Sequence, residues 1–162
     1  MDIKKRHAIQ KKDVKKLIYK VENSWKMPVT DLFKNAKMIE IAKTENYDVV
    51  IVDGFPVMFT DQECIFPTIK LLQSFDLPFK KVTVDMGAVK HIVSGANTMI
   101  PGIVELDEIE RGEIVVIVEE KNKKPLAVGR ALMNKEEIKR KKKGRAIETV
   151  HHIGDKIWRL KL

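Results

Sequence analysis

Cysteine is almost absent from this 162-residue chain, which has a single thiol at Cys64. One cysteine cannot form a disulfide within the chain, and the sequence contains none of the Cys/His clusters that bind structural zinc. No apolar run reaches the roughly 18 residues of a membrane span, and the N-terminus is too charged for a secretory signal peptide. We therefore expect a cytoplasmic protein with no metal site and no membrane contact.

Sequence patterns of catalysis are missing as well. There is no phosphate-binding P-loop, no dinucleotide-binding glycine fingerprint and no G-x-S-x-G nucleophile motif. Asp107, Glu108 and Glu110 supply carboxylates, but they form an acidic turn without a neighbouring base. Cys64 has no histidine or asparagine beside it that would activate the thiol. The sequence therefore predicts no catalytic residues and no cofactor, and it favours a binding protein over an enzyme.

Positive charge is what the chain has in excess. Its formal net charge is +8, with 33% charged and 44% hydrophobic residues. Residues 1–78 contain 13 Lys/Arg and 11 Asp/Glu, whereas residues 79–162 contain 18 and 12. The excess is concentrated in the second half, which is typical of a protein that binds a polyanion. A solvated surface that only keeps the protein soluble explains the same charge equally well.

The first 78 residues have the pattern of a small α+β unit. Apolar residues at helical spacing predict a helix over residues 10–22. Short apolar runs separated by turn signals predict three strands, over residues 38–44, 48–53 and 55–60. A further helix should begin near Pro67 and end before Pro78, because proline is favoured in a first helical turn and cannot continue a helix.

The second half has many short strands and few helices, which predicts a small barrel. Asp85 should cap a short helix that ends at Gly95, and Asn134 should cap another that ends at Gly144. The expected strands cover residues 81–84, 98–104, 113–119, 126–133 and 156–162, and the last of them should place Trp158 in the core. The join at residues 76–82 is too apolar for a flexible linker, so we expect the two halves to pack closely.

The most informative segment is residues 83–102, TVDMGAVKHIVSGANTMIPG. Small residues flank both ends of its short helix, Gly87-Ala88 at the start and Gly95-Ala96 at the end. Backbone N–H groups left open in this way can approach phosphates or base edges closely. Capping and turn formation explain each glycine separately. They explain less well why small residues occur at both ends of so short a helix.

The same segment resembles the signature of the PUA domain, an RNA-binding domain of pseudouridine synthases, archaeosine transglycosylases and translation factors. The matching residues are Asp85, Gly87, Ala88, Val93, Gly95, Ala96, Asn97, Pro101, Gly102 and Ile103. With IFPTIKLLQSF before it and GRAIETVHHIGDKIWRL after it, the chain resembles an archaeal-type member of one translation factor family. That family is the one of the malignant T-cell-amplified sequence protein and of the N-terminal half of ligatin. The likeness runs from about Met38 to Lys161 and is weakest over residues 1–37.

The resemblance implies an α+β fold, with a pre-PUA domain over residues 1–78 and a PUA pseudo-β-barrel over residues 79–162. It implies an RNA-binding translation factor that binds tRNA or the small ribosomal subunit in initiation, reinitiation or recycling. The implied partners are a tRNA acceptor end or structured rRNA, the small ribosomal subunit and a second factor with an initiation-factor-1-like domain. A specificity subunit that presents RNA to a separate tRNA- or rRNA-modifying enzyme is the alternative.

The resemblance also places the RNA surface around the short helix. The predicted RNA-binding residues are Lys81, Met86, Gly87, Ala88, Lys90, His91, Ser94, Gly95, Ala96, Asn97, Met99, Pro101, Gly102, Arg130, Lys141, Lys142, Lys143 and Arg145. The last four belong to the basic run KRKKKGR, residues 139–145, which either binds phosphates or is a solvated helix end that complements the helix dipole. His91 is either close to RNA or an ordinary surface histidine.

Overall fold

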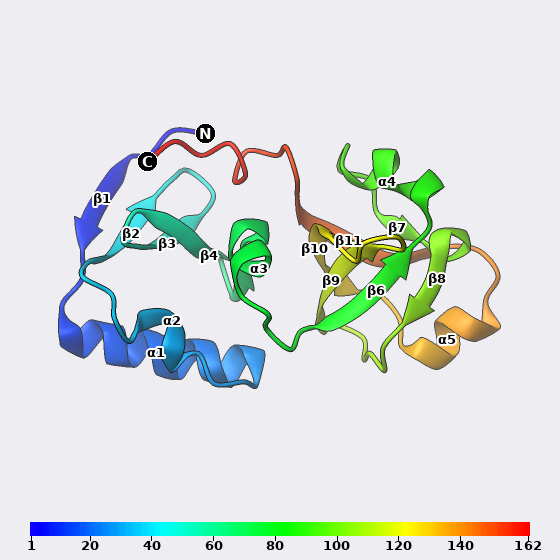
Figure 1. The fold of residues 1–162 in the computed structure, drawn as a ribbon, viewed down its shortest axis with the longest axis horizontal. Helices are drawn as coiled ribbons and strands as arrows, with labels where there is room; N and C mark the ends of the chain where they lie inside the picture. Colours follow the sequence, from blue (N-terminus) through cyan, green and yellow to red (C-terminus); the bar gives the residue numbers. More distant parts are fainter.

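A computed structural model describes residues 1–162 and contains two β-sheets, one in each half of the chain (Figure 1). The elements of the first half are β1 (Lys5–Ala8), α1 (Lys11–Trp25), α2 (Thr30–Phe33), β2 (Ile39–Lys43), β3 (Asp48–Val52), β4 (Phe55–Asp61), β5 (Cys64–Pro67) and α3 (Ile69–Ser74). Those of the second half are β6 (Lys80–Val84), α4 (Met86–Ile92), β7 (Thr98–Met99), η1 (Ile100–Gly102), β8 (Ile103–Leu106), β9 (Ile114–Glu119), β10 (Pro125–Ala131), α5 (Lys135–Arg140) and β11 (Arg145–His152). None of the helices is long and apolar enough to cross a membrane.

The first sheet is an antiparallel meander in the order β1-β2-β3-β4-β5. β3 and β4 are joined at the predicted turn, where Asp53 and Gly54 have φ values of 49° and 82°. Left-handed residues of this kind match the twist of a two-residue hairpin. The helix predicted over residues 10–22 and the three predicted strands are α1, β2, β3 and β4. The helix expected near Pro67 is α3, which Thr68 caps, while Pro67 itself ends β5. The prediction lacks β1, α2 and β5, because segments of four residues are too short to show a period.

The second sheet has the order β7-β11-β10-β9-β6-β8, in which only β6 and β9 run parallel. Its edge strands β7 and β8 follow one another in the chain, separated only by the three residues of η1. The two edges therefore lie close together, and the sheet curls into a nearly closed pseudo-barrel, as the sequence predicts. The continuous strand predicted over residues 98–104 is wrong. Pro101 has no N–H group and lies in the 3₁₀ turn between the two edges.

β10 and β11 approach one another too closely for any side chain at residue 129. A Cβ atom on Gly129 would lie 2.3 Å from the carbonyl oxygen of Glu148 and 2.7 Å from Cγ2 of Ile147. The register of the two strands shifts between Val128 and Gly129, and such a bulge bends a strand. Gly129 is one of the small residues that the sequence places on one face of this strand, and the close crossing of β11 requires it.

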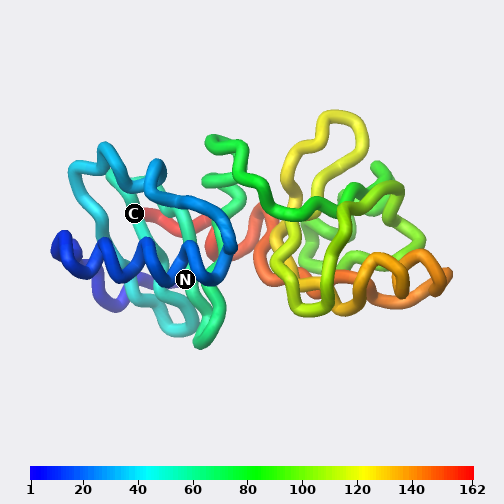
Figure 2. Tube along the Cα trace, turned by 90° about the horizontal axis from the view of Figure 1, so that it is seen from below, coloured from blue at the N-terminus to red at the C-terminus, as the bar shows by residue number.

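Residues 153–162 do not form the final strand that their alternation predicts. The last strand is β11, after which turns carry the chain out of the barrel and back to the first half (Figure 2). Ile157 and Leu160 are buried there in one cluster with Ala42 of β2. Their spacing of three residues is that of a turn, so the predicted strand over residues 156–162 is wrong. Trp158 is only partly buried, beneath the Nζ atom of Lys70, which lies 5.2 Å from its ring centroid.

The two halves share their cores, as the apolar join predicts. Nε1 of Trp25 donates a hydrogen bond to the carbonyl oxygen of Ile65 at 2.9 Å. The indole ring also meets Phe79 of the join edge-on, with 5.0 Å between the ring centroids. Val116 and Val118 of β9 belong to the same buried cluster. The second sheet therefore packs directly on the first half.

A buried histidine links the halves by hydrogen bonds. Nε2 of His151, in β11, accepts a hydrogen bond from the backbone N–H of Ile69, the first residue of α3, at 3.1 Å. The ring proton therefore lies on Nδ1, which donates to Oδ2 of Asp155 at 2.8 Å. Burial would raise the pKa of Asp155, but the hydrogen bonds from His151 and from the backbone N–H groups of Trp158 and His152 hold this pKa below its usual value.

Candidate nucleic-acid interface

The signature segment folds into α4 and the chain that faces it. Asp85 begins the helix as predicted, because its Oδ1 accepts a hydrogen bond from the N–H of Ala88 at 2.9 Å. The N–H of Asp85 donates to the carbonyl oxygen of Gly102 at 2.9 Å, which ties the start of α4 to the end of η1. A Cβ atom on Gly102 would lie 3.2 Å from that of Ala88. Small residues are therefore needed where these two segments meet.

Gly87 differs from the other glycines of the signature. A Cβ atom there would meet only Oδ1 of Asp85, at 3.4 Å, which is an ordinary van der Waals contact. The fold itself therefore tolerates a side chain at Gly87. Its lack of one leaves the surface of the first turn of α4 open.

The end of α4 is closed by a glycine and by a histidine from another strand. Gly95 has a φ of 97°, and a Cβ atom on it would lie 3.1 Å from Nε2 of His152. Nδ1 of His152 pairs with the carbonyl oxygen of Ile153 at 2.9 Å, so Nδ1 carries the proton and Nε2 is left as an acceptor. The signature does not contain His152, which reaches α4 only because β11 passes beside it.

The turn after α4 is held to β11 by two hydrogen bonds. Oδ1 of Asn97 accepts from the N–H of Thr149 at 2.9 Å, and Oγ1 of Thr149 donates to the carbonyl oxygen of Ala96 at 2.8 Å. These bonds fix the position of Ala96 while its side chain stays exposed. They also leave the amide nitrogen of Asn97 available for a ligand.

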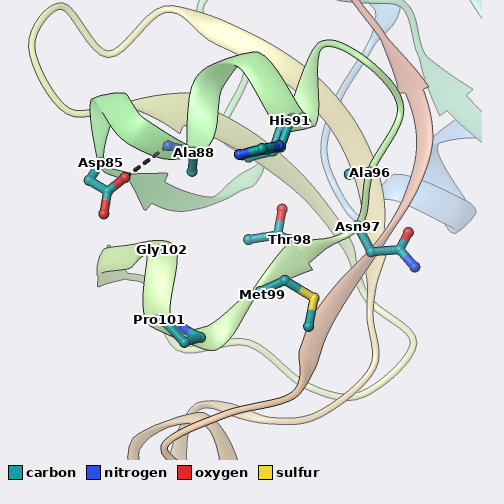
Figure 3. A pocket seen from close by; sticks show the side chains of 10 residues that line it. Asp85, Ala88, His91, Ala96, Asn97, Thr98, Met99, Pro101 and Gly102 are labelled. Atoms are coloured by element: carbon teal, nitrogen blue, oxygen red, sulfur yellow. Dashed lines mark hydrogen bonds between the residues drawn. The ribbon is translucent and has the colours of Figure 1, made fainter.

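A groove of about 470 Å³ lies between α4 and the β7–η1 segment. Figure 3 shows Ala88 and His91 of α4 facing Thr98, Met99 and Pro101 across it. The lining residues are Asp85, Ala88, His91, Ile92, Ala96, Asn97, Thr98, Met99, Pro101 and Gly102. Seven of the predicted RNA-binding residues are thus brought together in one cavity. Its size lies in the usual range of small-molecule sites.

Thr98 is the buried polar residue of the groove, and the sequence prediction misses it. Its side chain is 1% exposed, and its Oγ1 has no hydrogen-bond partner in the protein. Figure 3 shows the hydroxyl pointing into the groove toward α4. A buried hydroxyl without a partner costs about 1–3 kcal/mol, which a bound polar group would offset. No spacing rule identifies such a residue, because its lack of a partner depends on the folded surroundings.

Part of the predicted basic run lies at the rim of the groove. Arg145 pairs with Met99 in the register of β11 and β7, and the carbonyl oxygen of Gly144 accepts from the N–H of Ile100 at 2.9 Å. Lys141, Lys142 and Lys143 immediately precede these residues and are exposed. Lys90 is exposed on α4 but is not among the residues that line the groove. The groove is therefore weakly charged inside and basic at its border.

Two predicted RNA-binding residues lie apart from the groove. Arg130 forms an ion pair with Asp61 at 3.0 Å, and its guanidinium carbon lies 5.1 Å from the ring centroid of Phe66. It therefore joins β10 to the first sheet. Lys81 lies near the start of β6, at the opposite end of that strand from α4, and its N–H donates to Asp107. The remaining predicted residues, Met86, Gly87, Ser94 and Gly95, belong to α4 or to its end.

The pseudo-barrel, the α+β unit in front of it and the groove define a two-domain PUA protein. The PUA domain family matches residues 80–153, and the family described as "Domain of unknown function (DUF1947)" matches residues 5–74. A crystal structure of a PUA domain from Aeropyrum pernix superposes with a TM-score of 0.82 at 28% identity, over 95% of this chain and 89% of that one.

Similar proteins of known sequence identify the family more closely. An uncharacterized protein of Methanocaldococcus jannaschii is 42% identical over 99% of both chains. Translation machinery-associated protein 20 of Saccharomyces cerevisiae is 36% identical over 80% of this chain and 76% of its own. Malignant T-cell-amplified sequence 1 of Rattus norvegicus is 34% identical over 72% of this chain and 67% of its own. The chain belongs to the family that contains Translation machinery-associated protein 20 and Malignant T-cell-amplified sequence 1.

Proposed function

We propose that the protein is an RNA-binding translation factor that holds the acceptor end of a tRNA, or a structured segment of rRNA, in the groove between α4 and the β7–η1 segment. The buried hydroxyl of Thr98 carries this proposal, because it lies without a partner inside a groove with a basic rim. Sequence-specific RNA recognition mostly targets unpaired bases, which are splayed out and read on their edges. Thr98 would supply such a contact.

The neighbouring groups support an unpaired nucleotide as the ligand. The amide nitrogen of Asn97 and Nε2 of His152 offer a donor and an acceptor at the end of α4. Arg145 and the three lysines before it would bind the phosphates on either side of the base. Ala88 and Gly102 leave the floor of the groove free of bulk. Shape would therefore select the nucleotide, and the basic rim would add affinity.

We propose a binding role without catalysis. Asp85 and His91 are titratable groups of the groove, but Oδ1 of Asp85 already caps α4. Two of the relatives above are named for association with the translation machinery or for amplification in T cells, and neither name states an enzymatic activity. The protein would act in the cytoplasm, where tRNA and the small ribosomal subunit take part in translation.

The first half would dock on the small ribosomal subunit or on a second factor with an initiation-factor-1-like domain. We place the boundary between the two functional units at residue 78, where the chain passes from the first sheet to the second. Because the two halves share buried clusters and residues 153–162 pack on the first half, isolated residues 79–162 are a poor test of this division. Surface variants of the intact chain are the appropriate test.

The proposal is tested with two forms of one labelled tRNA, intact and without its single-stranded 3′ end, in a fluorescence anisotropy titration. The groove should bind the intact tRNA at least about tenfold more tightly, since the shortened form lacks the unpaired nucleotides. Equal affinity for both forms would contradict the acceptor-end proposal. Co-sedimentation of the purified protein with small ribosomal subunits tests the translation role. Co-purification with an RNA-modifying enzyme in place of ribosomal subunits would favour a presenting subunit.

A further inference from the structure

Helix α1 has one face in the core and one face that is exposed. Val21 is 0% and Trp25 6% exposed, and Val14, Leu17 and Ile18 pack against the same buried cluster. Tyr19, on the other side, is 71% exposed. Around it lie five exposed lysines, Lys11, Lys12, Lys15, Lys16 and Lys20. We call the exposed side, formed by these lysines and Tyr19, the α1 basic face.

The α1 basic face is not neutralised by the rest of the protein. None of its five lysines forms an ion pair. Glu22 lies on the same helix, but its Oε2 accepts a hydrogen bond from the N–H of Val29 at 2.8 Å. Lysines four residues apart recur about every 6 Å along the helix axis. The face therefore presents regularly spaced cations to an outside partner.

The first half has a small net charge because its positive and negative residues lie in different parts of it. Residues 1–26 contain nine Lys/Arg and three Asp/Glu, whereas residues 27–78 contain four and eight. The positive charge is thus gathered on the N-terminal strand and α1, and the negative charge lies in the rest of the sheet and its loops. A surface that served only solubility would not need this separation.

Helix stability does not explain the position of these lysines. Lys11 and Lys12 lie in the first turn of α1, where the helix dipole disfavours cations. Gln10 makes no side-chain capping bond there, and the last turn, where the dipole favours cations, contains no basic residue. Asp13 is the acidic residue of this turn and offsets one of the two lysines, so the first turn keeps a net charge of +1 at the end of the helix that favours negative charge. A partner that binds these lysines accounts for it.

A nucleic-acid partner fits this face better than a membrane does. A basic amphipathic helix binds a lipid surface by inserting its apolar side, and the apolar side of α1 is already buried. α1 is also convex and lies along the outside of the first half, on the same lower side of the molecule as α5 (Figures 1 and 2). A convex row of cations cannot enclose single-stranded RNA, but it can lie against the phosphates of an RNA double helix.

We infer that the α1 basic face binds the sugar-phosphate backbone of a base-paired RNA segment, as a second RNA contact separate from the groove. This inference rests on the proposed function and names the partner of the first half. The lysines bind phosphates without reading sequence, and Tyr19 packs against the backbone between them. The protein then holds one RNA in two ways, with an unpaired end in the groove and a helical segment on α1.

The test uses a blunt-ended RNA duplex of about 20 base pairs, which has no unpaired nucleotide for the groove. The variant replaces Lys12, Lys15, Lys16 and Lys20 by Gln, which has nearly the helix propensity of Lys, so α1 should keep its structure. The control replaces Lys34, Lys37, Lys121 and Lys124 by Gln, which changes the net charge equally at exposed positions elsewhere. Circular dichroism and thermal melting check the fold of both.

The α1 variant should bind the duplex at least about tenfold more weakly than the parent. The slope of log K against log salt should also become shallower by about 0.7 to 0.9 for each lost phosphate contact. The control should have nearly the affinity and the salt slope of the parent, because its lost charges act on the duplex only from a distance, where salt screens them. Ultraviolet crosslinking of the parent protein to the duplex should mark the peptide that contains Tyr19.

Two results would overturn the inference. The first is an α1 variant that binds the duplex with the affinity and salt slope of the control. The second is an α1 variant that keeps its RNA affinity and loses only a protein partner. If Ala96→Glu, at the mouth of the groove, abolishes tRNA binding while the α1 variant binds duplex like the control, the proposed function stands and this inference is wrong. If the parent binds neither tRNA nor duplex, the proposed function itself fails.

Discussion

The groove at α4 and the α1 basic face are opposite kinds of surface on one molecule. The groove is concave, lined largely by small and apolar residues, and contains one buried hydroxyl at Thr98. The α1 basic face is convex, exposed and charged. Shape and hydrogen bonds discriminate between ligands, whereas phosphate contacts supply affinity without discrimination. We therefore expect changes in the groove to alter which RNA is bound, and changes on the basic surfaces to alter how tightly any RNA is bound.

The largest effect is expected from Ala96→Glu. The side chain of Ala96 is exposed at the mouth of the groove, so the substitution adds bulk and negative charge there without straining Gly95. Specific tRNA binding should fall by about a hundredfold or more, equivalent to about 3 kcal/mol, while the melting temperature stays nearly unaltered. Anisotropy titrations and thermal melts measure both, with Asn35→Glu as an exposed control of equal charge. If this variant bound tRNA normally, the RNA site would not lie in the groove.

The next effect tests the basic rim. Replacing Lys141, Lys142 and Lys143 together by Gln should weaken binding to every RNA alike, by about tenfold at low salt. The salt slope should become shallower by about 0.7 to 0.9 for each lost contact. Titrations of the tRNA and of an unrelated RNA at several salt concentrations measure this. If the variant no longer discriminated between the two RNAs, these lysines would contribute to recognition in the groove. The division between a discriminating groove and basic surfaces that only add affinity would then be wrong.

A smaller and more selective effect is expected from Thr98→Val. The substitution removes the partnerless hydroxyl and keeps the shape of the side chain. Stability should stay the same or rise slightly, because a buried unsatisfied group is lost. The affinity for tRNA should nevertheless fall about threefold to tenfold, the cost of one neutral hydrogen bond. Unchanged affinity together with raised stability would mean that no ligand uses this hydroxyl.

The smallest effect on RNA binding is expected at the contact between the halves. Asp155→Asn replaces a carboxylate that accepts from His151 and from two backbone N–H groups, so the folded state should lose about 1–3 kcal/mol. RNA affinity at neutral pH should not change, because the groove and α1 are untouched.

The pH dependence follows from the lowered pKa of Asp155. A carboxyl whose pKa is lower in the folded state stabilises the fold at neutral pH, and this contribution is lost as the pH falls from about the usual value of 3.8 through the folded value. Chemical denaturation at several acidic pH values should show that the Asp155→Asn variant loses less stability on acidification than the parent. Equal acid sensitivity would mean that other carboxylates dominate.

Local patterns in the sequence predict local structure well. Asp85 and Asn134 cap their helices as expected, and Asn134 forms a full capping box with Glu137. The turn at Gly54 and the stop at Gly95 follow from the freedom of glycine to adopt positive φ. These features depend on residues within four positions of one another. A single sequence contains all the information that they require.

Features that depend on distant residues are the ones that the sequence does not reveal. β11 is absent from the prediction, and the alternation over residues 156–162 is misleading because Ile157 and Leu160 pack on another part of the chain. The site shows the same limit, since His152 joins it through the path of β11. Arg130 looks like an RNA ligand in sequence, yet its charge pairs with Asp61 in the first sheet.

The return of residues 153–162 to the first half has a consequence for how the protein is made. Ile157 and Leu160 complete a core cluster that otherwise consists largely of residues from the first sheet and α3. During synthesis the first half emerges from the ribosome long before these residues do, so it cannot close this core alone. Contacts between residues so far apart in the chain also form slowly. We expect the nascent first half to remain open at this face, and the two halves to reach their final packing in one late step.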